Sequence, residues 1–185
     1  MSEIPNHPVY SRNVLEMITV ANDYCMFMAK AETYSKKQLF DYLLKVGPLL
    51  YIKGSLLPDL DVQNPGAAEK FLQEEEWETL FTALRKVLLK DDEFWFIDNS
   101  DLKENQPIKA SLSESFADIY QDLKDFLTLY QKSSLDAKEN AVFELKQLFA
   151  THWGNRLVNA HKAMHYLNYN MIAGENQSGA SDFLN

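Results

Sequence analysis

Apolar residues recur at intervals of three and four through most of this chain, and that period limits the fold more than any other feature. In residues 9–31 the repeat consists of Tyr10, Val14, Met17, Ile18, Ala21, Cys25 and Met28. An α-helix has 3.6 residues per turn, so this spacing gathers the apolar side chains on one helical face. The same spacing returns at about 35–57, 74–90, 112–132 and 135–169. The sequence therefore predicts an all-α protein, a single-domain bundle of five or six helices with a long C-terminal helix.

The boundaries of these helices carry local signals. Serines predict N-caps at three starts: Ser35 with Gln38, Ser111 with Glu114, and Ser134. Gly47 and Pro48 predict a kink or break within the second helix, because proline has no backbone N–H to donate. After residue 173 the sequence turns to Gly, Asn, Ser and Gln. We therefore expect a helical bundle domain at 1–173 and a disordered tail at 174–185.

One segment, residues 91–110, lacks the helical period. It contains three consecutive aromatic residues, Phe94, Trp95 and Phe96. A connection of this length without its own structure is uncommon in a compact domain. We expect the rings either to cover the core as a lid or to form an apolar contact for a partner. No segment shows a convincing strand alternation, so no sheet is predicted.

Composition narrows the classes of partner and compartment. The chain has a net charge of −9 and a pI near 4.9, which disfavours nucleic acid and anionic membranes as partners. Its single cysteine, Cys25, excludes an intramolecular disulfide framework and a cysteine-based zinc site, and we expect it to be buried. No stretch reaches the ~18 uncharged apolar residues of a membrane span. The first residues also lack the features of a signal peptide, so we expect a cytoplasmic location.

The densest group of chemically versatile side chains lies near the C-terminus. Three of the four histidines fall within fourteen residues: His152, His161 and His165. We take Leu145 as the centre of the buried face of a straight helix. His152, Arg156 and Asn159 then lie within about 60° of that centre, as a polar stretch in an apolar stripe. Burying such groups costs free energy unless each is hydrogen-bonded, so we expect the three to share a network with acidic or tyrosine side chains.

A metal centre is not predicted from these histidines. His161 and His165 lie about 180° from His152 on the same projection, so the three cannot converge. An i, i+4 histidine pair can bind a metal, but Lys162 stands where the zinc protease motif has glutamate. We predict no metal ligands and no cofactor.

Three further features of the last two helices have structural interpretations. Gly154 costs about 1 kcal/mol relative to alanine inside a helix, which predicts close approach of another helix or loop at that turn. Trp153 is expected to be an anchor at the edge of the core. The acidic residues Asp118, Asp122 and Asp125 are expected to form a solvated face.

A combination of motifs resembles a known family. Ser115 to Lys124 reads Ser-x-x-Asp-Ile-Tyr-Gln-Asp-Leu-Lys, and His-Trp-Gly at 152–154 and Ala-x-x-x-x-His ending at His165 follow. The combination resembles a bacterial all-helical family of domains of unknown function, DUF family 5063, over about residues 10–168. The resemblance implies a helical bundle in a bacterial cytoplasm. It implies no activity, substrate or catalytic residue.

Two functions of different classes stay open at this stage. The first is a non-enzymatic protein-interaction or regulatory module, whose partner binds a helical face or the aromatic segment Phe94, Trp95 and Phe96. No glycine-rich phosphate loop, Walker lysine motif, nucleophile elbow or Cys-x-x-Cys pair is present, which favours this class. The sequence leaves the partner and the oligomeric state undefined.

The alternative is a small-ligand-binding or enzymatic bundle with a pocket at His152, Arg156 and Asn159. Arg156 could hold a carboxylate or phosphate, with His152 as acid or base. The environment of Arg156 discriminates between the two classes. A closed core with a carboxylate partner such as Asp122 or Glu16 would argue against a site, and a cavity would argue for one.

Overall fold

The computed structural model describes residues 6–62, 71–98 and 106–180, with side chains up to Tyr169. Its helices are α1 (Arg12–Met28), α2 (Lys36–Ser55), α3 (Glu74–Leu88), α4 (Leu112–Tyr130), α5 (Leu135–Leu148) and α6 (Gly154–Ala180). A π turn, η5 (Phe149–Trp153), joins α5 to α6, and short 3₁₀ turns lie at Pro8–Tyr10, Ala31–Thr33 and Leu89–Asp91. The prediction of an all-α bundle with a long C-terminal helix is confirmed. None of the described helices is both long enough and apolar enough to cross a membrane.

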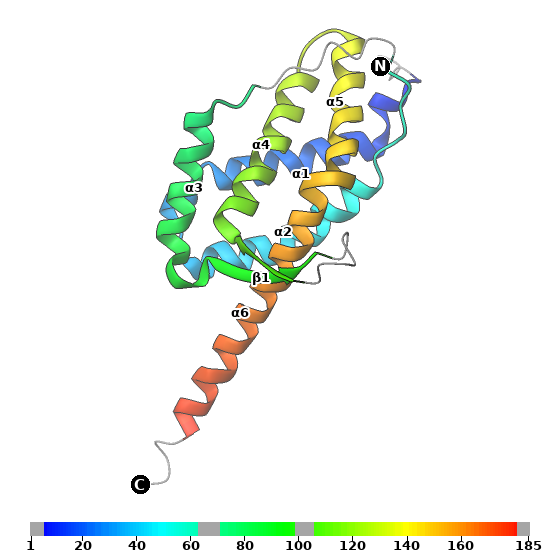
Figure 1. The fold of residues 1–185 in the computed structure, drawn as a ribbon. Helices are drawn as coiled ribbons and strands as arrows, with labels where there is room; N and C mark the ends of the chain where they lie inside the picture. The colour runs from blue at the N-terminus through cyan, green and yellow to red at the C-terminus, as the bar shows by residue number, and fades with distance from the viewer. Residues whose placement is uncertain (1–5, 63–70, 99–105, 181–185) are drawn as a thin grey trace.

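The helices form two layers around one core. Helices α3, α4 and α5 stand side by side, and α1 and α2 cross behind them (Figure 1). Helix α4 is central, since it packs against α1, α3, α5 and α6. The hydroxyl of Tyr24 on α1 donates to the Phe116 carbonyl oxygen of α4 at 2.9 Å, so the layers are tied by a buried hydrogen bond as well as by apolar contact.

The helix ends follow the predicted chemistry. Ser35 and Gln38 form a reciprocal capping box at the start of α2. Ser111 and Ser134 accept backbone N–H groups at the starts of α4 and α5. The expected break at Pro48 is absent, because α2 continues through it as a single helix from Lys36 to Ser55. One missing N–H donor is tolerated there, where the packing of α2 against α6 supports both sides of the proline.

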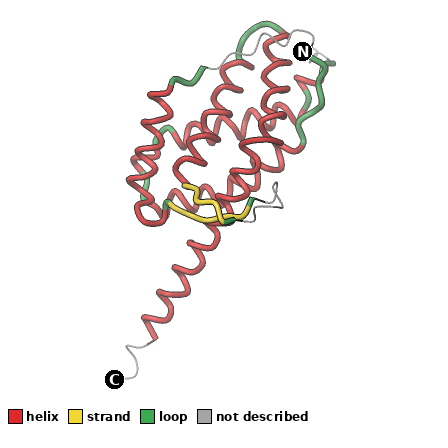
Figure 2. Tube along the Cα trace, viewed as in Figure 1, coloured by secondary structure: helices red, strands yellow, loops and turns green. Residues whose placement is uncertain are grey.

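Two paired strands lie in the segment 91–111, where the sequence predicts a loop without strands. Strands β1 (Glu93–Ile97) and β2 (Pro107–Ser111) pair antiparallel across the lower end of the bundle (Figure 2). Burial alternates along β1, with Phe94 inside and Trp95 outside. The alternation was missed because aromatic or apolar residues occupy both faces of β1, so the sequence lacks the usual polar-to-apolar contrast.

The π turn η5 explains a second departure from the straight-helix projection. Buried apolar residues of α5 are Ala137, Ala141, Val142 and Leu145, and those that follow are Trp153, Leu157, Ala160 and Met164. The centre of the second set is displaced from that of the first by about 105° on a straight-helix projection, close to the 100° that one extra residue in a turn adds. The polar residues predicted at the centre of the stripe therefore lie at its margin.

Gly154 and Trp153 have roles different from those predicted. A Cβ atom at position 154 would lie 2.3 Å from the Phe149 carbonyl oxygen, so glycine is needed by the π turn itself and not by another helix. Trp153 is fully buried, not at the core edge, and its Nε1 donates to the Leu145 carbonyl oxygen at 3.2 Å. Helix α2 approaches this ring through Gly54, where a Cβ atom would lie 2.5 Å from Trp153 Cη2.

Helix α6 continues beyond the bundle (Figure 1). Its backbone stays helical to Ala180, past residue 173, where the sequence analysis places the end of the domain. Of the tail expected to be disordered at 174–185, residues 181–185 lie outside the described residues.

Candidate functional site

The two predicted sets of site residues meet in one cleft. It lies between the inner face of the β1–β2 hairpin and the helical turns from η5 into α6, with a volume of about 350 Å³. The hairpin contributes Phe94, Phe96, Ile108, Lys109 and Ala110, α4 contributes Glu114 and Ser115, and the helical wall contributes Thr151, His152, Asn155, Arg156 and Asn159. The cleft therefore has an apolar wall and a polar wall, from segments about fifty residues apart in sequence.

Asp92 fixes the hairpin against the start of α4. This carboxylate is buried and accepts hydrogen bonds from the Ser113 backbone N–H at 2.8 Å, the Ser113 hydroxyl at 2.9 Å and the Ser111 hydroxyl at 3.0 Å. Three donors compensate the cost of burying the carboxylate. The position of the hairpin is thus set by the N-terminus of the central helix.

His152 and Arg156 form the polar wall with two aspartates of α4. His152 Nδ1 lies 2.7 Å from Asp122 Oδ2, and Arg156 Nε donates to His152 Nε2 at 3.1 Å. The accepting role of Nε2 implies a neutral imidazole whose proton is on Nδ1 and points at Asp122. Arg156 Nη1 lies 2.9 Å from Asp118 Oδ2. Both ring nitrogens of His152 are thus engaged within the protein.

The aspartates of α4 are not a solvated face, as the sequence analysis expected. Asp118 also accepts a hydrogen bond from Trp77 Nε1 at 2.9 Å, so it links α3 to α6. Asp125 Oδ1 accepts the backbone N–H groups of Phe71 and Leu72 at 2.9 and 2.7 Å, just before α3. The three aspartates share one face of α4, but that face is covered by α3, the η5 turn and α6.

The predicted hydrogen-bonded network is confirmed for His152 and Arg156 and wrong for Asn159. The Asn159 amide donates instead to the Asn155 side-chain oxygen at 3.4 Å, within α6. Of the acidic and tyrosine side chains expected as partners, the acidic ones take part; Tyr130, on the same helix α4, donates its hydroxyl to the Val9 carbonyl oxygen at 2.8 Å instead. The partners of His152 and Arg156 are carboxylates rather than hydroxyls, because a carboxylate neutralises the charge of Arg156 as well as accepting hydrogen bonds.

The environment of Arg156 combines both predicted outcomes. Its guanidinium has a carboxylate partner, Asp118, yet the side chain is 36 % exposed and lines the cleft. Glu114 Oε1 lies 4.0 Å from the same Nη1. Lys109 of the hairpin also lines the cleft, and its Nζ lies 2.8 Å from Glu93 Oε1 on the neighbouring strand. Carboxylates outnumber the cations around the cleft, so an anion would compete with groups already in place.

The three aromatic residues of β1 are separated by the strand geometry. Phe94 is buried and Phe96 is half-buried, and both face the cleft. Trp95 points away from the bundle and is 64 % exposed, and Ile97 on the same face is 52 % exposed. Phe94 and Phe96 therefore cover the bundle end, as the lid interpretation predicts, and Trp95 is exposed on the opposite face of the strand, where a partner contact stays a prediction.

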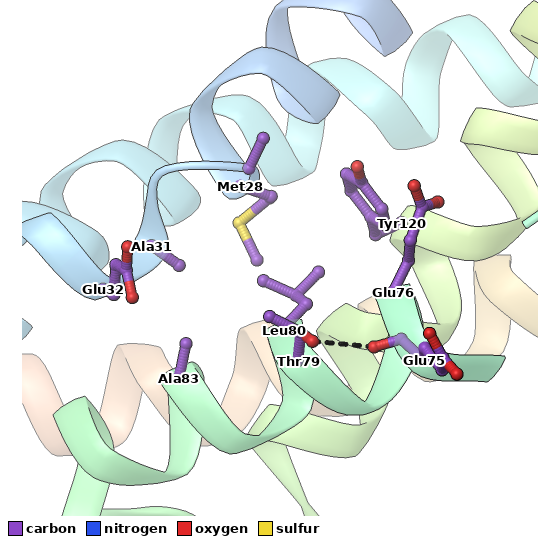
Figure 3. Close-up of a pocket in the computed structure, with 10 residues that line it drawn as sticks. Met28, Ala31, Glu32, Glu75, Glu76, Thr79, Leu80, Ala83 and Tyr120 are labelled. Carbon is purple, nitrogen blue, oxygen red and sulfur yellow. Dashed lines mark hydrogen bonds between the residues drawn. The ribbon is translucent and has the colours of Figure 1, made fainter. Parts of the chain in front are cut away.

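A second hollow, beside α3, has a different chemistry. Its volume is about 370 Å³, and its floor is formed by Met28, Leu80, Ala83 and Tyr120, with Glu32, Glu75 and Glu76 at the rim (Figure 3). Burial, then the charges of Cys25 and Glu76, raise the pKa of Tyr120. Among the described residues, no three His, Cys, Asp or Glu side chains are grouped so that they could hold a metal ion.

The remaining candidate groups are placed away from the cleft. His161 and His165 face α2 on the other side of α6, in agreement with the predicted separation from His152. Cys25 is buried as expected, and burial raises the pKa of its thiol to about 12. A thiol with that pKa is protonated at neutral pH and is a poor nucleophile.

Comparisons with known proteins agree with this architecture. The sequence model of the family described as Domain of unknown function (DUF5063) matches residues 8–170. The crystal structure of protein BF1032 from Bacteroides fragilis is similar to this chain, with a TM-score of 0.77 and 32 % sequence identity. That similarity covers 87 % of this chain and 95 % of the other. A comparison with curated proteins gives no match.

Proposed function

Because the chain belongs to the DUF5063 family, whose description assigns no activity, we propose its function from geometry: a non-enzymatic protein-interaction module that binds its partner through the β1–β2 hairpin. The observation that carries the proposal is the exposure of Trp95, which is 64 % exposed to solvent. Tryptophan is among the residues that contribute most to protein interfaces, because it buries a large apolar area at a low cost in side-chain entropy.

The hairpin presents Trp95 on a fixed platform. Ile97 lies on the same outer face, and Lys109 is the cross-strand neighbour of Trp95. The inner face is packed against the bundle through Phe94, and Asp92 anchors the base of the hairpin. A partner with an apolar pocket would meet a preorganised surface, and little ordering entropy would be lost on binding.

The polar wall of the cleft supports a binding role over a catalytic one. A general base needs a free lone pair at the position of the substrate proton. In His152 the Nε2 lone pair accepts from Arg156 and the Nδ1 proton points at Asp122. Removing a proton from a substrate would first require Arg156 to leave its partners.

The test is affinity capture with Trp95→Ser/Ile97→Ser, compared with wild type and with Met26→Ser. Met26 is 60 % exposed on α1 and is the matched control for loss of an exposed apolar side chain. All variants should keep their stability within about 0.5 kcal/mol, as is usual for surface substitutions. We expect the hairpin variant to lose a partner that the Met26 variant retains. Equal recovery of every captured protein by all three would show that the hairpin is not the contact.

A second candidate function, binding of a small ligand, is favoured by the joint lining of the cleft. Phe94 and Phe96 offer ring faces, while Arg156 and Asn159 offer donors on the opposite wall. Benzamidine and benzoate share a ring and differ in charge, so comparing them shows whether the donors Arg156 and Asn159 or the surrounding carboxylates decide which charge the cleft accepts. The excess of carboxylates predicts that benzamidine raises the melting temperature more than benzoate, and that Glu114→Gln weakens the effect. No shift with either compound would count against the cleft as a ligand site.

A further inference from the structure

An apolar groove lies on the side of α6 that faces away from the cleft. It runs between α2 and α6 and has a volume of about 460 Å³. Helix α2 lines it with Gly47, Pro48, Tyr51 and Ile52, and α6 lines it with Leu157, Val158, His161, Lys162 and His165. The lining contains no Asp or Glu, although the chain has 27 of them. Two copies of a chain with net charge −9 would repel each other least at such a face.

The groove leaves large apolar side chains in water. Tyr51, Ile52 and Val158 are 43 %, 51 % and 48 % exposed. Adjacent exposed apolar side chains of this number are typical of an interaction surface, whereas single ones are ordinary. Burial, then His165, lower the pKa of His161, so its ring stays neutral in the groove at neutral pH.

The same face of α6 continues past the bundle. Val158, His161, His165 and Tyr169 recur at steps of three and four and fall within about 80° of rotation. The rings of His165 and Tyr169 lie 4.5 Å apart, so the stripe is continuous. Tyr169 is 56 % exposed and Tyr166 is 70 % exposed. The C-terminal part of α6 projects beyond the bundle (Figure 1). The four residues 166–169 carry no charge.

We propose that the chain forms a homodimer in which the α6 helices of two copies pack antiparallel, the projecting end of each lying along the α2–α6 groove of the other. One surface supplies both a groove and a helix to fill it, which is the self-complementarity that a twofold contact requires. The end of α6 from Tyr166 to Ala180 is about 22 Å long at 1.5 Å per residue. The groove extends over Leu157–His165, about 14 Å on the same scale, so the projecting end is long enough to cover it.

The stripe also fixes the register. With a twofold axis beside His165, a residue n positions after 165 in one copy lies opposite the residue n positions before 165 in the other copy. The partner's Tyr169 then lies opposite His161, and the partner's His165 lies opposite His165. Lys162, at the edge of the groove, stays at the rim of the contact.

Two measurements on the full chain test the dimer. Sedimentation velocity from low micromolar concentration upward should give about twice the chain mass of 21.4 kDa. Val158→Glu and Tyr169→Glu, which place a carboxylate in the contact, should shift the protein toward monomer by at least tenfold in dissociation constant. Met26→Glu on α1 is the matched control and should leave the dimer unchanged. Circular dichroism melting identifies any variant that fails to fold.

Cross-linking tests the register separately. His165→Cys should form a disulfide-linked dimer on mild oxidation, because the two positions face each other across the axis. Asn155→Cys, exposed on another part of α6, should not. The native Cys25 is buried and should not interfere. The proposal would be overturned by a chain that is monomeric throughout the concentration range. It would also be overturned by a dimer whose dissociation constant is unchanged in both Val158→Glu and Tyr169→Glu.

Discussion

The two sides of α6 differ in how their side chains are satisfied within one chain. Toward the cleft, His152 and Arg156 are engaged by Asp122 and Asp118, and the polar groups are paired within the chain. Toward the groove, apolar side chains remain in water, and His161 Nδ1 is buried without a hydrogen-bond partner among the described residues. The cleft side is complete within one chain, whereas the groove side has the character of a surface that needs a second molecule.

The largest expected effect concerns the two glycines through which α2 approaches α6. Gly54→Ala would place a Cβ atom 2.5 Å from the fully buried Trp153 ring and 2.7 Å from Phe149 Cδ2. Overpacking costs about 1–3 kcal/mol and outweighs the gain of about 1 kcal/mol in helix propensity. A 2.5 Å contact with a rigid, buried ring lies at the upper end of that overpacking range. We therefore expect a net loss in the free energy of unfolding of about 2 kcal/mol, measured by urea denaturation.

The matched control is Gly47→Ala, because Gly47 also lies on α2 but lines the open groove. Its Cβ atom would lie 3.0 Å from His161 Nδ1, and that half-buried ring has room to move toward the groove. The gain in helix propensity should then leave stability within about 0.5–1 kcal/mol of wild type. Equal destabilisation by both alanines would show that the groove side is packed as tightly as the Trp153 side.

A smaller effect is expected from breaking the polar wall of the cleft. Arg156→Met leaves Asp118 with Trp77 Nε1 and removes the donor to His152. A fully buried pair would lose about 3–5 kcal/mol, but the Arg156 side chain is 36 % exposed, and solvent screening reduces the expected loss to about 0.5–1 kcal/mol. Thermal melting at low salt measures the difference.

The control for that variant is Arg12→Met. Arg12 Nε pairs with Glu16 at 2.6 Å, but its side chain is 89 % exposed. Exposed pairs contribute little, so we expect no measurable change. If Arg156→Met had the same melting temperature as Arg12→Met and wild type, the cleft network would contribute nothing to holding α4 against α6.

The smallest expected effect is a pH dependence from the groove. Burial lowers the pKa of His161 in the folded chain below its unfolded value of about 6.5, so the unfolded chain binds more protons as the pH falls through that range. Stability from this group is therefore complete above about pH 7 and declines below about pH 6.5. His161→Leu should remove that part of the decline.

The check is a series of denaturation curves from pH 8 to pH 5 for wild type and His161→Leu. The difference between the two proteins should be constant at the upper end of this range and should shift in favour of the variant at the lower end. A constant difference throughout would mean that the His161 ring is as well solvated in the folded chain as in the unfolded one.

Local sequence determined the helices of this protein and their caps. The apolar period is a property of each segment, so it predicted α1 to α4 without knowledge of their neighbours. Ser35, Ser111 and Ser134 cap the helices that follow them because the bond from a cap side chain closes within three residues. The separation of His152 from His161 and His165 also followed from helical rotation alone.

Tertiary structure decided the features that depend on distant partners. The π turn at Phe149–Trp153 turns the apolar stripe of α6 and brings Trp153 from the core edge to full burial, and no periodicity in the sequence marks the inserted residue. The acidic face of α4 is covered only because α3 and α6 pack over it. The cleft joins Phe94 and Phe96 to Arg156 because the hairpin folds across the bundle end, a contact that no local pattern encodes.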